Sequence, residues 1–431
     1  MTSRRQFLHT SAATIAAAAA TARAQTPSAN DRLRVAVMGL GRGMDHIQGW
    51  LAVPNVEIAG LCDVDSRRLA GGAAAVARAG QSAEPRLVAD VRTLLDDKEI
   101  DVLSIAAPNF WHAPATILAC AAGKHVYVEK PGSHTGQESE WMVASARTHQ
   151  RLVQQGTQRR SLPAMREAIQ RLKEGAIGPV RAARCWYTAA RGAVTLKPNV
   201  PVPDWLNWPL WQGPCPEMPY LEGLVHYNWH WRWHYGGGEL ANNGVHALDL
   251  ALWGLDAHWA ATHGRPLTPL CVSAIGDRYH FQDDQETPDT LVAAFDFGPC
   301  AAYFDGSSCS QRKGVDQHAF VTFYGDNGSL ALSSSGYTLF DPAGTKIAEN
   351  EPPFDDRPHF QNLADAIRNG APLHCDIEAG QRAARLCHLG NIAHRTRSTL
   401  NCDPQSGAIQ NNDAALKLWS KPYRDGWQPR V

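Results

Sequence analysis

Short apolar runs alternate with helical stretches between residues 33 and 157, and this alternation constrains the fold more than any other feature. The runs are rich in β-branched residues and lie at 33–39, 56–62, 101–106 and 125–129. A helical stretch at 113–122, ended by Gly123, separates the last two. Apolar strands that alternate with helices predict a parallel sheet with helices on both faces.

The remainder of the chain follows a different pattern. A stretch rich in Trp and Pro occupies 188–235. Strands with alternating polarity are expected at 289–297, 301–305, 319–324 and 329–333. Helices are expected at 163–174, 360–368 and 377–394. Because no helical pattern separates the strands, we expect an antiparallel sheet.

Composition excludes several classes of protein. At 431 residues the chain is long enough for two or three domains. With 41 basic and 42 acidic residues, it has no electrostatic footprint for nucleic acid or an anionic membrane. Its ten cysteines include no CxxC pair, and the pair His230 and His234 lacks an evident carboxylate partner, so no metal site is expected.

The first residues have the pattern of an export signal. Residues 3–8 read Ser-Arg-Arg-Gln-Phe-Leu, an apolar stretch follows, and Ala22-Arg23-Ala24 resembles a cleavage site. The stretch at 12–22 is shorter than the ~20 residues that span a bilayer. No Cys follows the cleavage site, so no membrane anchor is expected. We predict a twin-arginine signal peptide at 1–24 and a periplasmic or secreted protein.

A glycine turn joins the first strand to the first helix. It reads Gly39-Leu40-Gly41-Arg42-Gly43-Met44. Glycines there allow a tight turn and a close approach of the backbone to a pyrophosphate, while the helix N-terminus supplies positive charge. The third glycine of the usual fingerprint is replaced by Met44. The turn predicts a dinucleotide site.

An acidic residue accompanies this turn. Asp63 ends the second strand, 24 positions after Gly39, and suits the ribose hydroxyls of NAD. Arg67 and Arg68 lie close by and leave NADP open.

Four segments carry a resemblance to a known family. They are 39–46, 107–112, 122–131 and 236–249. The third reads Ala-Gly-Lys-His-Val-Tyr-Val-Glu-Lys-Pro and is the most specific. Through these segments the chain resembles the Gfo/Idh/MocA oxidoreductase family.

The resemblance implies an α/β protein of two domains. An N-terminal Rossmann dinucleotide-binding domain is expected at 32–157. A C-terminal α+β domain with an open, mainly antiparallel sheet is expected at 158–431, and its last helices are expected to pack back on the first domain. Family members are often oligomers, so we expect a homodimer or homotetramer. They act mostly on hydroxyls of sugars and cyclitols, so the expected partner is a carbohydrate-like small molecule.

Site residues follow from the resemblance by position. The expected cofactor-binding residues are Gly39, Gly41, Arg42, Gly43, Met44, Asp63, Pro108, Asn109, His112, Glu129, Lys130 and Gln158. The expected catalytic residues are Lys130, Asn242 and His246. These three, with Tyr227 and Trp229, are expected to contact the substrate.

The catalytic residue types fit the oxidation of an alcohol. Lys130 can hydrogen-bond the reacting oxygen, and His246 can carry its proton because imidazole titrates near ~6.5. If 242–249 is helical, Asp249 can approach His246 and orient its ring. Many members carry Asp where this chain has Asn242, and an amide can bind a hydroxyl but cannot act as a base.

Aromatic residues cluster in the second half of the chain. The run from Tyr227 to Tyr235 includes Trp229, Trp231 and Trp233. Flat aromatic faces suit sugars, and core packing or a subunit interface explains the run equally well.

Export constrains the mechanism, because free nicotinamide cofactors are not expected outside the cytoplasm. We therefore predict an NAD(P)-dependent oxidoreductase with a tightly bound, internally recycled cofactor, acting on a hydroxyl of a sugar, cyclitol or glycoside. One alternative is an NAD-dependent glycosidase that works by transient oxidation, elimination and re-reduction. The other is an exported sugar-binding protein without catalysis.

Overall fold

The computed structural model describes residues 32–312 and 320–431, and the predicted signal peptide at 1–24 lies outside them. Its strands are β1 (Leu33–Met38), β2 (Val56–Cys62), β3 (Arg86–Val88), β4 (Val102–Ile105), β5 (His125–Val128), β6 (Val153–Gln155), β7 (Val180–Thr188), β8 (Cys271–Asp277), β9 (Thr290–Asp296), β10 (Ala301–Ser307), β11 (Val321–Gly325), β12 (Gly328–Leu332), β13 (Tyr337–Phe340), β14 (Lys346–Asn350), β15 (Leu400–Cys402) and β16 (Ile409–Gln410). Its α-helices are α2 (Gly43–Leu51), α3 (Ser66–Arg78), α4 (Arg92–Leu95), α5 (Asn109–Ala121), α6 (Gly136–Thr148), α7 (Pro163–Lys173), α8 (Trp208–Gln212), α9 (Val245–His263), α10 (Arg357–Asn369), α11 (Ile377–Thr396) and α12 (Asp413–Lys417).

The first six strands form one parallel sheet, as predicted. Their order is β3-β2-β1-β4-β5-β6, the Rossmann arrangement. Alternate residues of β1 enter opposite cores: Val35 and Val37 pack on one side, Ala36 and Met38 on the other. This two-sided burial explains why the strands read as continuous apolar runs. The sequence analysis missed β3 and β6, which have three residues each.

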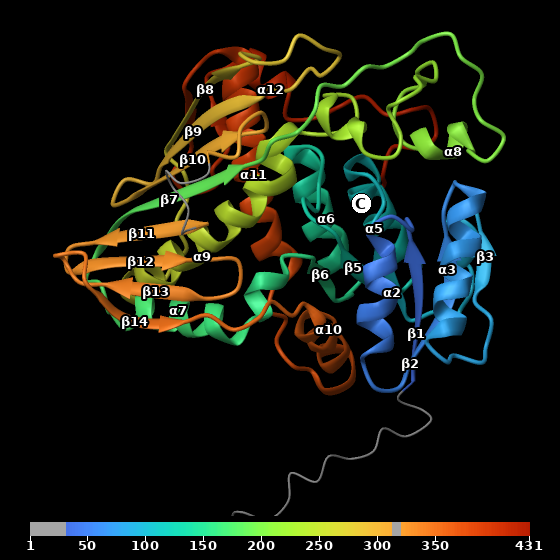
Figure 1. Ribbon diagram of the computed structural model, residues 1–431, viewed down its shortest axis with the longest axis horizontal. Coiled ribbons are helices and arrows are strands. Elements are labelled where there is room, and N and C mark those ends of the chain that lie inside the picture. The colour runs from blue at the N-terminus through green and yellow to red at the C-terminus, as the bar shows by residue number, and fades with distance from the viewer. Residues whose placement is uncertain (1–31, 313–319) are drawn as a thin grey trace, which may run out of the picture. The chain divides into compact units, whose positions relative to one another are not determined.

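The other ten strands form a second sheet, seen on the left of Figure 1. Their order is β14-β13-β12-β11-β7-β10-β9-β8-β15-β16. Every neighbouring pair is antiparallel except β7 with β10, so the predicted, mainly antiparallel sheet is confirmed. A parallel pair requires a long crossover, and here it contains α9. The expected strand at 319–324 begins at Val321, and Ala319 lies outside the described residues.

Helix α10 packs on the first sheet although it is far away in the sequence. Phe360 is fully buried, stacks on Tyr127 with ring centroids 4.6 Å apart and meets Trp50 edge-on at 5.4 Å. At Gly49 an added Cβ would lie 2.4 Å from the Phe360 ring, so glycine is required for this approach. The packing joins the last part of the chain to β5 and α2.

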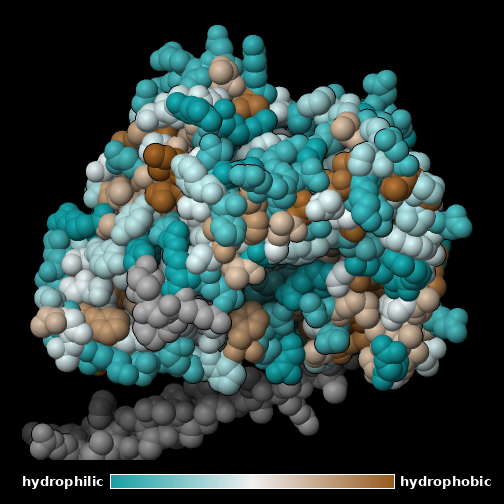
Figure 2. Space-filling view, turned by 45° about the horizontal axis from the view of Figure 1, so that its top comes forward, coloured by the Kyte–Doolittle hydropathy of each residue, from teal (hydrophilic) through white to brown (hydrophobic). Residues whose placement is uncertain are grey.

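The outer surface is largely polar. Hydrophilic residues dominate the face shown in Figure 2, and hydrophobic residues form small separate groups on it. Isolated exposed apolar side chains, such as Ile275 and Tyr279, are normal in folded proteins. Across 32–312 and 320–431, no helix has both the length and the apolar character needed to cross a membrane.

We expect Phe360→Ala to lower the free energy of unfolding by about 3–5 kcal/mol, because it leaves a cavity against Tyr127 and Trp50. Denaturant titration followed by circular dichroism measures the change. Leu416→Ala, at an exposed site, is the control and should change stability by less than about 0.5 kcal/mol. Equal losses in both variants would show that α10 does not contribute to the core in this way.

Candidate active site

A cavity of about 720 Å³ lies at the carboxyl ends of the parallel strands. Gly39 follows β1, Asp63 follows β2, Ala107 follows β4 and Glu129 follows β5, and all four line it. Ligands bind at this edge in open parallel sheets, and the volume suits a small-molecule site. Other lining residues come from the segment after β6, such as Gln158, and from the chain beyond β7, such as Trp211 of α8.

The cavity brings together most residues that the sequence singled out. Its lining includes Gly39, Gly41, Arg42, Asp63, Pro108, Asn109, His112, Glu129, Lys130, Gln158, Tyr227, Trp229, Asn242 and His246. The expectation that Gly43 and Met44 line it is not met. A Cβ at Gly43 would lie 3.0 Å from Val37, and Met44 packs against the same core. Gly43 and Met44 therefore pack α2 against β1. Close packing of the helix on the strand is the usual role of the third position of this fingerprint.

The glycine turn leaves its backbone open to a ligand. Gly39 has φ +85°, and an added Cβ would lie 2.6 Å from the Ala106 carbonyl oxygen. An added Cβ at Gly41 would lie 2.7 Å from Nη1 of Arg68. Glycine is therefore required at Gly39, while at Gly41 the end of the flexible Arg68 side chain lies close, and a turn of this kind is consistent with a dinucleotide pyrophosphate.

Asp63 holds the glycine turn in place through hydrogen bonds to the backbone. Its carboxylate accepts hydrogen bonds from the backbone N–H groups of Leu40 (2.6 Å) and Asp65 (2.8 Å). Burial raises the pKa of Asp63, and these two N–H groups oppose the rise. Asp63 thus fixes the loop while it also lines the cavity.

The two neighbouring arginines take different places. Arg67 pairs with Asp65 at 2.8 Å and lies over the Trp205 ring at 3.6 Å. Arg68 lines the cavity beside Gly41. Of the two, Arg68 is placed to meet a phosphate.

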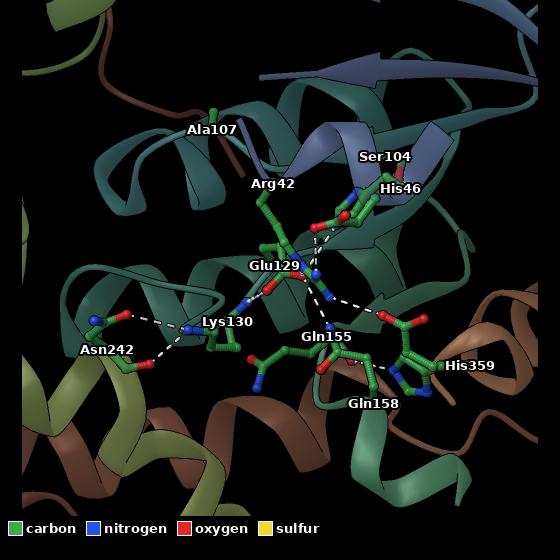
Figure 3. Close-up of polar contacts among 12 residues, drawn as sticks. Arg42, His46, Ser104, Ala107, Glu129, Lys130, Gln155, Gln158, Asn242 and His359 are labelled. Atoms are coloured by element: carbon green, nitrogen blue, oxygen red, sulfur yellow. Dashed lines mark hydrogen bonds and ion pairs between the residues drawn. The ribbon is translucent and has the colours of Figure 1, made fainter. Parts of the chain in front are cut away.

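Glu129 is the centre of the polar network in Figure 3. Its Oε1 accepts hydrogen bonds from Arg42 Nε (3.3 Å) and Gln158 Nε2 (3.2 Å), and lies 3.2 Å from His46 Nε2. Burial alone would raise the pKa of this carboxyl, but the hydrogen bond from His46 and the charge of Arg42 lower it well below its usual value. Glu129 is therefore a carboxylate at neutral pH.

A second layer of polar residues holds His46 in place. His46 Nδ1 lies 2.9 Å from Ser104 Oγ, and Trp50 Nε1 donates to the same oxygen at 2.9 Å. His46 and Ser104 are fully buried. Sequence reasoning assigned them no role, although His46 ends the first family segment and Ser104 is a lone polar residue in an apolar strand.

Lys130, Asn242 and His246 all line the cavity. Lys130 Nζ donates to the backbone oxygen of Asn242 at 2.7 Å and lies 3.4 Å from its Oδ1, as Figure 3 shows. Asn242 lies in a π-helical turn, Leu240–Gly244, which runs into α9. Single π-helical turns are frequent at functional sites.

The surroundings of Lys130 and His246 lower the pKa of both side chains. Burial lowers the pKa of Lys130, while Glu129 and Glu239 counteract the change. Burial and the charge of Lys130 lower the pKa of His246 well below its usual value. His246 is thus a neutral imidazole at pH 7, able to accept a proton.

The structure does not support the expected pairing of Asp249 with His246. Asp249 is buried and accepts both of its side-chain hydrogen bonds from Arg160 Nε, at 3.0 and 2.9 Å. A buried carboxylate requires such a partner, and Arg160 supplies it. The sequence could not reveal this, because Arg160 is 89 residues away.

The aromatic residues and histidines divide between two places. Tyr227, Trp229 and His230 line the cavity, and His230 stacks on Trp229 with centroids 3.6 Å apart. His234 lies outside it and faces the Pro216 carbonyl at 3.0 Å. The two histidines do not converge, and the described part of the chain contains no group of three or more His, Cys, Asp or Glu side chains placed to hold a metal.

Two family models match the chain. One, described as an oxidoreductase family with an NAD-binding Rossmann fold, matches residues 33–157. The other, described as the C-terminal alpha/beta domain of the same family, matches 181–259. The chain belongs to the Gfo/Idh/MocA oxidoreductase family. The resemblance seen in the sequence is confirmed, and with it the NAD-binding Rossmann fold of the N-terminal domain.

Individual members of the family are similar over part of the chain. The levoglucosan dehydrogenase of Pseudarthrobacter phenanthrenivorans is 36% identical over 119 residues, which are 28% of this chain and 29% of that protein. A glycosyl hydrolase family 109 protein of Saccharopolyspora erythraea is 34% identical over 131 residues, 29% and 28% of the two chains. The chain therefore matches less than a third of the length of either relative.

A solved structure extends the likeness of fold. The aldose-aldose oxidoreductase from Caulobacter crescentus, complexed with glycerol, superposes with a TM-score of 0.64 at 20% identity. The superposition covers 86% of this chain and 99% of that one.

We expect Glu129→Gln to destabilise the protein by about 3–5 kcal/mol at pH 7, because it removes the charge that pairs with Arg42 and, with the amide oxygen at the Oε1 position, sets the NH2 group against the backbone N–H of Lys130. The folded-state pKa of Glu129 lies below the unfolded value, so its contribution is complete above pH ~4.3 and is lost as the pH falls further. Denaturant titrations of both proteins at several pH values measure the difference.

The exposed Glu84 provides the control variant, Glu84→Gln. Its stability should follow that of the wild type at every pH. A difference between wild type and Glu129→Gln that stays constant down to pH 3 would contradict the assignment of Glu129 as a stabilising carboxylate.

Proposed function

We propose that this protein is an NAD-dependent oxidoreductase that acts on a hydroxyl group of a sugar, a cyclitol or a glycoside. The observation that carries the proposal is that Lys130 and a neutral His246 line the same cavity as the Gly39 turn. The names of the similar levoglucosan dehydrogenase and aldose-aldose oxidoreductase support the substrate class. The tyrosine and tryptophan in the lining, Tyr227 and Trp229, suit a sugar face.

Each catalytic side chain then has a defined task. Lys130 donates a hydrogen bond to the reacting oxygen, and Asn242 holds the ammonium group in place. His246 accepts the hydroxyl proton through a ring nitrogen as the C–H bond breaks and the carbonyl forms. NAD, when bound, supplies the acceptor for the hydride. The glycine turn, Asp63 and Glu129 would hold it.

A tightly held cofactor is the second part of the proposal. Residues 205–207 pair with the segment just after Asp63: Ser66 N donates to Trp205 O at 3.0 Å, and Asn207 N donates to Val64 O at 2.9 Å. His226 Nε2 lies 2.9 Å from Asp65 Oδ2. We call residues 205–226 the strap. These hydrogen bonds hold the tryptophan-rich segment against the loop that carries Asp63. A strap held in this position slows the release of a bound dinucleotide.

The strap agrees with the export expected from the first 24 residues. We propose that the protein leaves the cytoplasm folded, with its cofactor loaded, and that each catalytic cycle returns the cofactor to its starting state. We also propose that the protein is a homo-oligomer. The cofactor returns to its starting state in one of two cycles: either two substrates are used in turn, one oxidised and one reduced, or one substrate is oxidised and then re-reduced.

The second of these cycles defines the alternative function. A glycosidase could oxidise a ring hydroxyl, remove the proton from the acidified neighbouring carbon, eliminate the leaving group from the next carbon, add water across the resulting double bond and re-reduce the carbonyl. The similar glycosyl hydrolase family 109 protein favours this alternative. A panel of sugars and glycosides separates the two: a 340 nm change without cleavage indicates the oxidoreductase, and cleavage at catalytic levels of cofactor indicates the glycosidase.

We expect Lys130→Met and His246→Ala to lower kcat by roughly 10²–10⁴-fold while the protein still binds NAD. Steady-state rates with the best substrate of the panel, together with cofactor content of denatured extracts, measure both effects. His280→Ala, at an exposed site, is the control. Wild-type rates in both variants would refute the catalytic assignment, and no turnover in any protein would favour a binding protein without catalysis.

We expect the double variant Trp205→Ala, His226→Ala to release NADH about 10- to 100-fold faster, because it removes one cation–π contact and one charge-assisted hydrogen bond from the strap. Stopped-flow fluorescence of NADH displaced by excess NAD measures the rate. Tyr279→Ala, an exposed aromatic residue, should release NADH at the wild-type rate. An unchanged rate in the double variant would show that the strap does not retain the cofactor.

A further inference from the structure

A second cavity, of about 360 Å³, lies apart from the candidate active site. Its walls come from the segment after β5, from the glycines before the π-helical turn, from α11 and from the chain after α12. It shares no lining residue with the first cavity. Nothing in the proposed reaction uses it.

The charge of this cavity is positive. Three cations line it, Arg395, Lys417 and Lys421, and no carboxylate among the described residues does. Lys421 is already paired with the buried Glu138 at 2.7 Å. Arg395 and Lys417 are exposed and lie at its opening.

Inside the cavity, buried groups present unused hydrogen-bond acceptors. His388 is 6% exposed, and its Nε2 faces Ser133 Oγ at 2.9 Å. The Ser133 hydroxyl donates its proton to Gln381 at 2.6 Å, so it can only accept from His388. His388 therefore carries its proton on Nε2, and its Nδ1 is an acceptor that has no partner within 32–312 and 320–431.

Asn391 and His234 also present hydrogen-bond acceptors in this cavity. The amide of Asn391, 8% exposed, donates to the Gly237 oxygen at 2.9 Å, and its Oδ1 has no partner among the described residues. His234 Nε2 faces the Pro216 carbonyl at 3.0 Å, so it must hold the proton there, and Nδ1 is again an acceptor.

Burial and the charges of Arg385 and Lys421 lower the pKa of His388 to about 3, so the ring stays neutral at pH 7.

A ligand that satisfies this cavity needs two features. It needs an anionic oxygen group for Arg395 and Lys417, and it needs several O–H donors for His234, His388 and Asn391. A simple inorganic anion lacks the donors, and a neutral sugar lacks the charge. We propose that the second cavity binds a small polyhydroxylated anion, of the sugar-acid or sugar-phosphate class.

Isothermal titration calorimetry of the mature protein with its cofactor tests this proposal. The probes are gluconate and glucose 6-phosphate, with glucose and sulfate as comparisons. We expect gluconate or glucose 6-phosphate to bind at least about tenfold more tightly than sulfate, because sulfate has no O–H donors for the three acceptors. The stronger of gluconate and glucose 6-phosphate identifies whether the carboxylate or the phosphate is preferred.

Variants of the cavity's exposed cations test where the anion binds. We expect Arg395→Gln combined with Lys417→Gln to weaken binding about tenfold or more, because both charges at the opening are lost. Arg397→Gln, which removes an exposed charge from the end of the same helix outside the cavity, should bind normally. Lys130→Met should also bind normally.

Three results would overturn the proposal. The first is that neither anion binds. The second is that binding survives the double variant but is lost in Lys130→Met, which would place the anion in the first cavity. The third is that sulfate binds as tightly as the hydroxylated anions. None of these results bears on whether Lys130 and His246 act in the proposed reaction.

Discussion

The buried carboxylate of Glu129 fixes the geometry on which the rest of the candidate site depends. A charge in such a place is stable only when donors surround it, and Arg42, His46 and Gln158 supply them. Glu129 also accepts from the backbone N–H of Lys130, at 3.1 Å. The position of the next residue, the candidate catalytic lysine, is therefore determined by the same network.

The network also connects parts of the chain that are far apart in sequence. Arg42, from the glycine turn, reaches Asp356 just before α10 at 3.1 Å. Lys130 reaches Asn242, 112 residues later. The glycine turn after β1 and His246 of α9 thus line one cavity, although they are far apart in the sequence.

The sequence was most informative where local pattern and chemistry coincide. The parallel sheet follows from runs such as Leu33–Met38 that are buried on both sides, and the cavity residues follow from short motifs at strand ends. The family resemblance supplied Lys130, Asn242 and His246, since no local pattern distinguishes a catalytic histidine from a buried one. Partners across long sequence distances could not be predicted, as the pairing of Arg160 with Asp249 shows. The supporting role of Ser104 depends on the same kind of distant contact.

A crystal structure of the mature protein, purified without added cofactor, tests the central claim most directly. The account predicts density for a dinucleotide along the Gly39 turn, with its nicotinamide end between Glu129, Lys130 and His246. A protein that contains no dinucleotide, and that still shows none in this cavity after soaking with NAD or NADH, would contradict the account.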